Sequence, residues 1–200
     1  MPSQEIPAPP VPGAALVLDA AAIERTLRRI AHEIIEGNPD LDHLALVGIP
    51  SRGTALARRI AAAIAEIAGR PVETGVIDVS MHRDDLSIRQ RMSLVEQSRL
   101  PKDLEERTLV LVDDVLYSGR TCRAAMDAIS SFGRPPRIQY AVLIDRGHRE
   151  LPIRADYVGK NFPTALGERV FVRLQATDRQ PDAVWISRAK ETAEKGEKES

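Results

Sequence analysis

The sequence has little of several features that mark other classes of protein. It contains one cysteine, Cys122, which excludes an intrachain disulfide framework and a zinc site built on several cysteines. No apolar run approaches the roughly 18 residues that a membrane-spanning helix needs. No charged-then-apolar signal segment begins the chain. We therefore expect a cytoplasmic protein with one folded core.

The two ends of the chain differ from its middle in charge pattern and composition. The net charge of −1 does not indicate a nucleic-acid partner by itself, but binding depends on where charge lies rather than on its sum. The proline-rich residues 1–17 hold little to bury, and residues 188–200 alternate charges without an apolar face. We expect a disordered leader over 1–17, a folded domain over 18–187 and a charged tail over 188–200.

Between these ends, short apolar runs alternate with amphipathic segments. The pattern predicts strands at 44–49, 72–79, 109–112 and 138–144, and helices at 19–37, 53–68 and 120–132. Such alternation is typical of an α/β fold with a mostly parallel sheet flanked by helices. Residues 145–178 are irregular apart from a late strand near 169–174, and we expect them to form a small C-terminal cap.

The segment after the third expected strand carries the chemistry. The aliphatic run 109–112 leads into two adjacent carboxylates, Asp113 and Asp114, and then into a loop of small and hydroxyl residues before a helix. Ligands of open α/β sheets bind at the carboxyl ends of strands, and N–H groups at a helix start bind anions. The carboxylates would repel phosphate, but they can accept hydrogen bonds from ribose hydroxyls. The segment therefore predicts a ribose 5-phosphate site, whereas an ordinary capped helix would leave the acidic pair unexplained.

Several stretches carry a family resemblance. Residues 109–121 resemble the phosphoribosyl-pyrophosphate (PRPP) signature of type I phosphoribosyltransferases, and residues 48–54 resemble the pyrophosphate loop of that superfamily. Residues 80–87 and 145–161 resemble one subfamily, the bifunctional pyrimidine operon attenuation regulators and uracil phosphoribosyltransferases. The resemblance implies a type I phosphoribosyltransferase fold. It also implies transfer of uracil to PRPP, giving UMP and pyrophosphate, with Mg²⁺ as a cofactor held largely by PRPP oxygens and water.

The resemblance also implies a role for each matching residue. Asp113 and Asp114 would hold the ribose hydroxyls, could touch Mg²⁺, and with Arg52 are the expected catalytic residues. The 5′-phosphate loop would consist of Val115, Leu116, Tyr117, Ser118, Gly119, Arg120 and Thr121. Pyrophosphate would be bound by Ser51, Arg52, Gly53 and Arg83, with a strained or cis peptide at Arg52. Uracil and the nucleotide would be bound by Arg146, Val158, Gly159, Lys160 and Val170.

Some of these residues have a simpler interpretation. Arg83 lies beside two aspartates and could form a surface ion pair, and Lys160 could be solvated. The polar stretch from about 86 to 107 is expected to be the mobile flap that closes over PRPP to exclude water.

A second expected function concerns RNA. In the first helix, the basic residues Arg28, Arg29 and His32 fall on the side opposite the apolar stripe. The resemblance implies that they form an RNA-binding face on a dimer or higher homo-oligomer together with His148, Arg149 and Arg154. That face would bind a stem-loop of pyrimidine-operon leader mRNA when UMP is bound. An enzyme without RNA regulation, and a nucleotide-sensing regulator with little turnover, both stay open.

Overall fold

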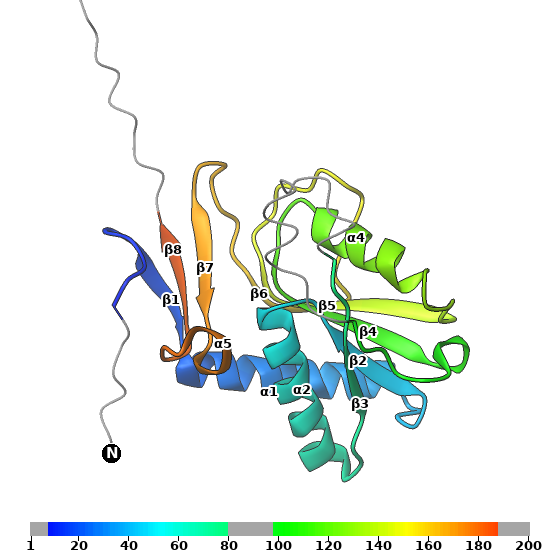
Figure 1. The fold of residues 1–200 in the computed structure, drawn as a ribbon. Helices are drawn as coiled ribbons and strands as arrows, with labels where there is room; N and C mark the ends of the chain where they lie inside the picture. The colour runs from blue at the N-terminus through cyan, green and yellow to red at the C-terminus, as the bar shows by residue number, and fades with distance from the viewer. Residues whose placement is uncertain (1–7, 80–97, 188–200) are drawn as a thin grey trace, which may run out of the picture.

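The structure is a computed structural model that describes residues 8–79 and 98–187 (Figure 1). A five-stranded sheet has the order β3-β2-β4-β5-β6, and every neighbouring pair in it is parallel. Its strands are β2 (Leu44–Gly48), β3 (Glu73–Val76), β4 (Thr108–Leu116), β5 (Arg137–Asp145) and β6 (Tyr157–Asn161). A separate antiparallel sheet has the order β1-β8-β7 and consists of β1 (Ala15–Asp19), β7 (Arg169–Arg173) and β8 (Ala183–Ser187).

Helices cover both faces of the five-stranded sheet. Helices α1 (Ala20–Gly37) and α2 (Arg52–Ala68) lie on one face, and α4 (Arg120–Ile129) lies on the other. Side chains alternate along a strand, so Val110 and Val112 of β4 pack with α1 and α2. Leu109 and Leu111 of the same strand pack with α4. This arrangement confirms the predicted α/β fold with a mostly parallel sheet flanked by helices.

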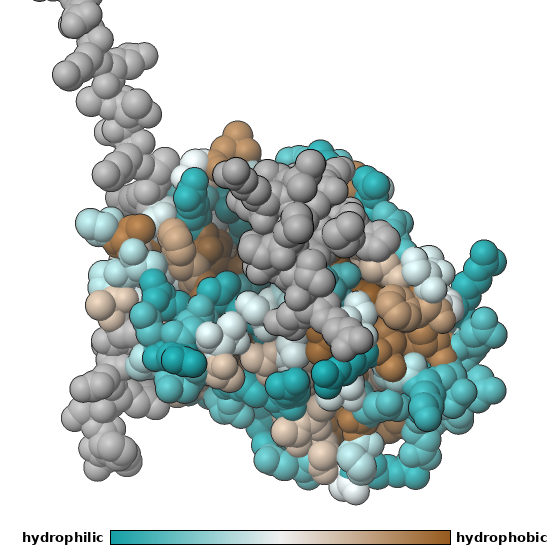
Figure 2. Space-filling view, in the orientation of Figure 1, coloured by the Kyte–Doolittle hydropathy of each residue, from teal (hydrophilic) through white to brown (hydrophobic). Residues whose placement is uncertain are grey.

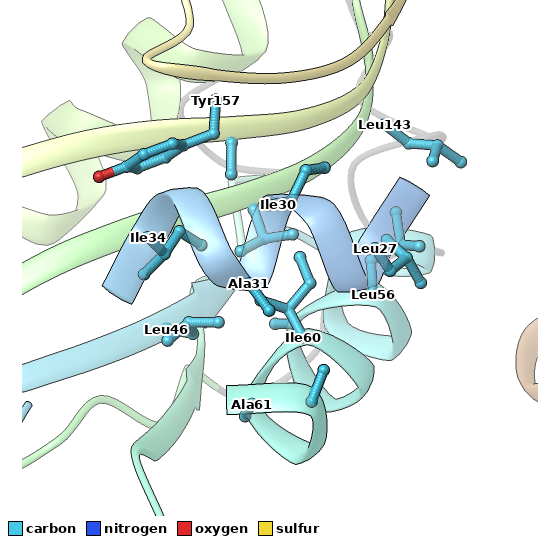
Figure 3. Close-up of a cluster of buried hydrophobic side chains, with 14 of the residues drawn as sticks. Leu27, Ile30, Ala31, Ile34, Leu46, Leu56, Ile60, Ala61, Leu143 and Tyr157 are labelled. Atoms are coloured by element: carbon cyan, nitrogen blue, oxygen red, sulfur yellow. The ribbon is translucent and has the colours of Figure 1, made fainter. Parts of the chain in front are cut away.

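Helix α1 begins and packs as its sequence predicts. The side chain of Asp19 accepts a hydrogen bond from the Ala22 N–H at 2.7 Å and so caps the helix. Its buried stripe includes Ile30 and Ile34, which lie between α2 and β6 (Figure 3). Burying a large aliphatic side chain of this kind contributes about 1.5–3 kcal/mol, so this stripe fixes α1 against the sheet.

The C-terminal cap differs from the sequence-based prediction. Strand β6 lies inside the predicted cap, but it is the edge strand of the main sheet and pairs with β5. Strand β7 pairs with β8, and β8 pairs with β1. Strand β1 begins at Ala15, so the predicted leader 1–17 is too long. Both ends of the folded chain therefore build the small sheet, a long-range pairing that local sequence patterns do not reveal.

Three other boundaries also differ. The expected strand 72–79 is reduced to Glu73–Val76, and the expected helix 120–132 ends at Ile129. Strand β4 continues through the acidic pair to Leu116 because β5 pairs with it along that length. The described end of the predicted flap, residues 98–107, is packed: Arg99 pairs with Val76, and Leu104 in the short 3₁₀ helix η1 (Leu104–Glu106) is buried.

Within residues 8–79 and 98–187, no helix is both long and apolar enough to cross a membrane. On the face shown in Figure 2, hydrophilic residues cover much of the lower edge, and hydrophobic residues form separate patches among them.

Candidate active site

A pocket of about 400 Å³ lies where β4 and β5 end and α2 and α4 begin. It brings together most of the residues expected to bind PRPP, including two loops that lie far apart in the sequence. Its lining consists of Pro50, Ser51, Arg52, Asp113, Asp114, Val115, Leu116, Tyr117, Ser118, Gly119, Arg120, Thr121, Cys122, Tyr140, Arg146 and Val170. Gly53 lies directly behind this lining, and Arg83 falls outside the described residues.

The expected phosphate loop forms the start of α4. Gly119 is the N-cap residue with φ of 92°, a left-handed conformation that glycine adopts without strain. A Cβ atom at this position would lie 3.2 Å from Ile153 Cβ, so glycine also lets the segment after β5 pack closely on the loop. At the start of α4, N–H groups and the helix dipole favour an anion. The Ser118 carbonyl accepts hydrogen bonds from the N–H groups of Glu150 and Leu151 at 3.0 and 3.1 Å. The segment after β5 therefore holds this loop in place.

The two aspartates have different surroundings. Adjacent residues of a strand point to opposite faces, and only Asp114 approaches Arg52, with 3.9 Å between Oδ2 and Nη1. Asp113 is buried and accepts a hydrogen bond from the Tyr140 hydroxyl at 3.2 Å. Burial, followed by the charge of Asp114, raises the pKa of Asp113 well above its ordinary value. The sequence predicts one shared role for the pair, but the structure makes Asp114 the more accessible acceptor.

The pyrophosphate loop packs directly on β4. A Cβ atom on Gly53 would lie 2.3 Å from the Val112 carbonyl oxygen, so only glycine permits this approach. The cis peptide joins Pro50 to Ser51, one bond before the position expected from the sequence. The Arg52 guanidinium lines the pocket and forms two hydrogen bonds to Asp178, at 3.0 and 2.6 Å.

Asp178 and Tyr140 belong to the site but are not among the residues expected from the sequence. Tyr140 lines the pocket and donates to Asp113, and Asp178 holds Arg52 from outside it. No local pattern indicates either residue, because each meets its partner only in the folded chain.

Arg146 is a buried cation in the pocket. Its guanidinium lies 4.3 Å from the centre of the Tyr117 ring, within the range of a cation–π contact. It also donates to the Thr164 hydroxyl at 3.0 Å and to the Glu168 carbonyl at 2.7 Å. Arg146 therefore joins the phosphate loop to residues 164–168, in the connection between β6 and β7.

The residues expected to bind uracil lie in two places, and only some of them line the pocket. Arg146 and Val170 line the pocket, whereas Val158, Gly159 and Lys160 do not. The carbonyls of Val158 and Gly159 accept hydrogen bonds from Arg29 at 2.9 and 2.5 Å. Those two acceptors are engaged by α1, so the expected contacts of uracil with this backbone stay a prediction.

The basic residues of α1 expected to contact RNA are less free than predicted. Arg29 is held by β6 and by an ion pair with Glu33, and Arg28 pairs with Glu66 at 3.1 Å. His32 and, in the cap, Arg154 are exposed.

In the segment after β5, Arg149 turns inward, which differs from the expected RNA-facing position. It pairs with Asp145 and donates to the carbonyls of Ile153 and Tyr117 at 2.9 and 3.0 Å. The His148 ring lies edge-on to Tyr117, with 6.2 Å between ring centres.

Comparisons with known proteins agree with this fold. The family model of the phosphoribosyl transferase domain matches residues 14–168. A hypoxanthine phosphoribosyltransferase from Trypanosoma cruzi, solved with its product IMP, has a TM-score of 0.63 at 20% identity, covering 86% of this chain and 89% of that chain. HGPRT-ase from Leishmania tarentolae, solved with GMP, has a TM-score of 0.64 at 17% identity, covering 89% and 99%. At these identities the structural likeness shows the fold alone.

Relatives with higher sequence identity show to which group within this family the chain belongs. The bifunctional protein PyrR of a Roseiflexus species is 56% identical over 177 residues, which cover 88% of this chain and 97% of the relative. The bifunctional protein PyrR of Chloroflexus aurantiacus is 58% identical over 168 residues, covering 84% and 92%. The chain therefore belongs to the phosphoribosyl transferase family and, within it, to the bifunctional PyrR proteins.

Proposed function

We propose that the protein joins uracil to PRPP, giving UMP and pyrophosphate. The observation that carries this proposal is one pocket that combines the open start of α4, the carboxylate of Asp114 and the guanidinium of Arg52. These groups suit a phosphate, a ribose and a pyrophosphate, which are the three parts of PRPP. The name of the bifunctional PyrR relatives is consistent with this activity and a second one.

Each part of PRPP has a different element to bind it. In the proposed complex the 5′-phosphate lies against the loop 115–121, and Asp114 accepts hydrogen bonds from the ribose hydroxyls with Asp113 beneath it. Ser51 and Arg52 bind the pyrophosphate, whose bond to the anomeric carbon breaks as N1 of uracil bonds to that carbon and loses its proton. Binding both reactants in one orientation lowers the barrier by avoiding their loss of freedom in the transition state.

The residues of the pocket fit Mg²⁺ only together with PRPP. Among the described residues, no group of three or more His, Cys, Asp or Glu side chains could hold a metal ion. Asp114 offers carboxylate oxygens, the ligand type that Mg²⁺ prefers, and PRPP and water would supply the remainder. When bound, the ion would offset the negative charge of the leaving pyrophosphate.

A labelled-uracil assay with PRPP and Mg²⁺ tests the proposal, with Asp114→Asn as the variant. A hydrogen bond to a charged group contributes about 1.5–3 kcal/mol, so we expect kcat/KM for PRPP to fall more than tenfold. Asp127→Asn is the matched control because Asp127 is exposed on α4, pairs with Arg123 at 3.4 Å and lies outside the pocket. No UMP from the parent protein, or equal activity of the Asp114 variant, contradicts the proposal.

We also propose that the protein binds a pyrimidine-leader mRNA stem-loop when UMP is bound, as a homodimer or higher homo-oligomer. The supporting observation is the exposed basic side of α1, which carries Arg25, Arg28 and His32. Arginine and histidine suit contacts with RNA phosphates and loop bases. Arg29 connects this side of α1 to β6, so a variant that changes Arg29 would disturb the edge of the main sheet as well.

A gel-shift titration at two salt concentrations tests RNA binding. Arg28→Glu with His32→Glu should weaken binding and leave uracil transfer unchanged, since neither residue lines the pocket. Each lost phosphate contact should flatten the dependence of log K on log salt by about 0.7–0.9. Arg70→Glu, at an exposed ion pair beyond α2, is a charge-reversal control outside α1. No RNA binding by the parent with UMP present would leave only the enzyme.

A further inference from the structure

Arg52 is held from one side by a carboxylate that lies outside the pocket. Its Nε and Nη2 atoms donate to the two oxygens of Asp178 at 3.0 and 2.6 Å. The remaining nitrogen, Nη1, lies 3.9 Å from Asp114 Oδ2, on the side of the pocket. One edge of the guanidinium is therefore occupied by Asp178, and the remaining nitrogen faces Asp114 in the pocket.

Asp178 is itself fixed at the edge of the small antiparallel sheet. It ends the short helix α5 (Gln175–Asp178), which follows β7 and lies beside the start of α2 (Figure 1). Its side chain also accepts a hydrogen bond from the Leu174 N–H at 2.9 Å. Burial would raise the pKa of Asp178, but the hydrogen bonds from Arg52 and Leu174 outweigh it and lower the pKa. Asp178 is therefore ionised at neutral pH and pairs with Arg52 at full charge.

A bidentate carboxylate partner reduces the conformational entropy that a long arginine side chain loses when a ligand binds. An arginine that is free in solution samples many rotamers, and fixing it on ligand binding costs conformational entropy. A bidentate carboxylate fixes both the plane and the direction of the guanidinium before the ligand arrives. The free edge then meets an anion without a further ordering cost.

We propose that Asp178 is a positioning residue that holds Arg52 for the pyrophosphate group of PRPP. The inference rests on the proposed function and adds to it a residue from the C-terminal cap. Asp178 does not line the pocket, so it acts on the ligand only through Arg52.

A second ion pair, between α2 and a residue just after the cap, distinguishes positioning from simple stabilisation. Arg59, further along α2, pairs with Asp182 and with Glu24. Asp182 is buried at least as deeply as Asp178, with side-chain exposures of 11% and 18% respectively. Arg59 does not line the pocket. If these two ion pairs only stabilise the fold, Asp178→Asn and Asp182→Asn should behave alike.

Isothermal titration calorimetry of the full chain tests the inference with two ligands. PRPP with MgCl₂ carries the pyrophosphate, whereas UMP carries the same 5′-phosphate and ribose without it. Asp178→Asn should bind PRPP about tenfold more weakly, a loss typical of a misplaced binding group, and should bind UMP as the parent does. Asp182→Asn should bind both ligands as the parent does. In an Arg52→Gln background, Asp178→Asn should cause no further loss of PRPP affinity.

Each outcome has a definite meaning. Equal PRPP affinity in Asp178→Asn and the parent overturns the inference, as does an equal loss for PRPP and UMP. If Asp178→Asn does not fold, Asp178→Glu keeps the charge but displaces the guanidinium, and it should weaken PRPP binding while leaving UMP binding unchanged. A parent protein that binds no PRPP overturns the proposed function, and the inference with it.

Discussion

Gly53→Ala gives a direct test of how closely the pyrophosphate loop must approach β4. The added Cβ would lie 2.3 Å from the Val112 carbonyl oxygen and 3.2 Å from the Cα of Asp113, both of them backbone atoms. Nonbonded carbon atoms normally lie about 3.5–4.0 Å apart, so relief of the closer contact requires a shift on the order of 1 Å. Strand β4 is buried between β2 and β5, so the start of α2 has to move instead.

The shift should affect activity more than stability. Overpacking of this kind typically costs about 1–3 kcal/mol of unfolding free energy. A displacement of about 1 Å at a binding group can cost on the order of a hundredfold in rate, and Ser51 and Arg52 move with α2. Urea unfolding and kcat/KM for PRPP would measure the two effects separately.

Gly69→Ala is the matched control for this variant. Gly69 ends α2 with φ of 68°, and no atom lies within 4 Å of the position that an added methyl group would take. The substitution therefore strains only the local backbone. It should cost about 1 kcal/mol of stability and leave kcat/KM unchanged. If Gly53→Ala retains the activity of the parent, the close packing of the loop on β4 does not position the pyrophosphate site.

Two further predictions concern the acid pair and the base. Burial raises the pKa of Asp113 above 3.8, so the folded state holds that proton more tightly and stability declines as pH rises through the folded pKa. Asp113→Asn should reduce this decline of the unfolding free energy with pH, which urea unfolding measures from about pH 4 upward. An unchanged dependence of the unfolding free energy on pH would contradict the burial argument. Cytosine should be a poor substrate beside uracil, because its amino group and unprotonated N3 mismatch groups that pair with uracil. Comparable turnover of cytosine would show that the pocket does not read the base in this way.

The main sheet is well predicted because its signals are local. The apolar runs of β2, β4 and β5 and the stripe of α1 each lie within one segment, and the acidic pair with its loop is contiguous. The small sheet is different, since β1 pairs with β8 from the other end of the chain. No local pattern indicates that pairing.

The site shows the same division between local and long-range features. Contiguous residues predict the phosphate loop and the pyrophosphate loop, and the pocket contains both. The engagement of Arg52 by Asp178 joins residues 126 positions apart, and that of Arg29 by Val158 joins residues 129 positions apart. Charge and spacing in the sequence do not reveal that these arginines are already paired in the folded chain.

The pairing of β1 with β8 has a consequence for how the protein is made. Among the strands that the structure describes, β1 leaves the ribosome first and its partner β8 leaves it last. Contacts of such high sequence separation form slowly because the intervening chain must first be brought together. The main sheet can therefore form before β1 pairs with β8. The segment that carries Asp178 follows β7 in the chain, so it reaches α2 only after all strands of the main sheet have been synthesised.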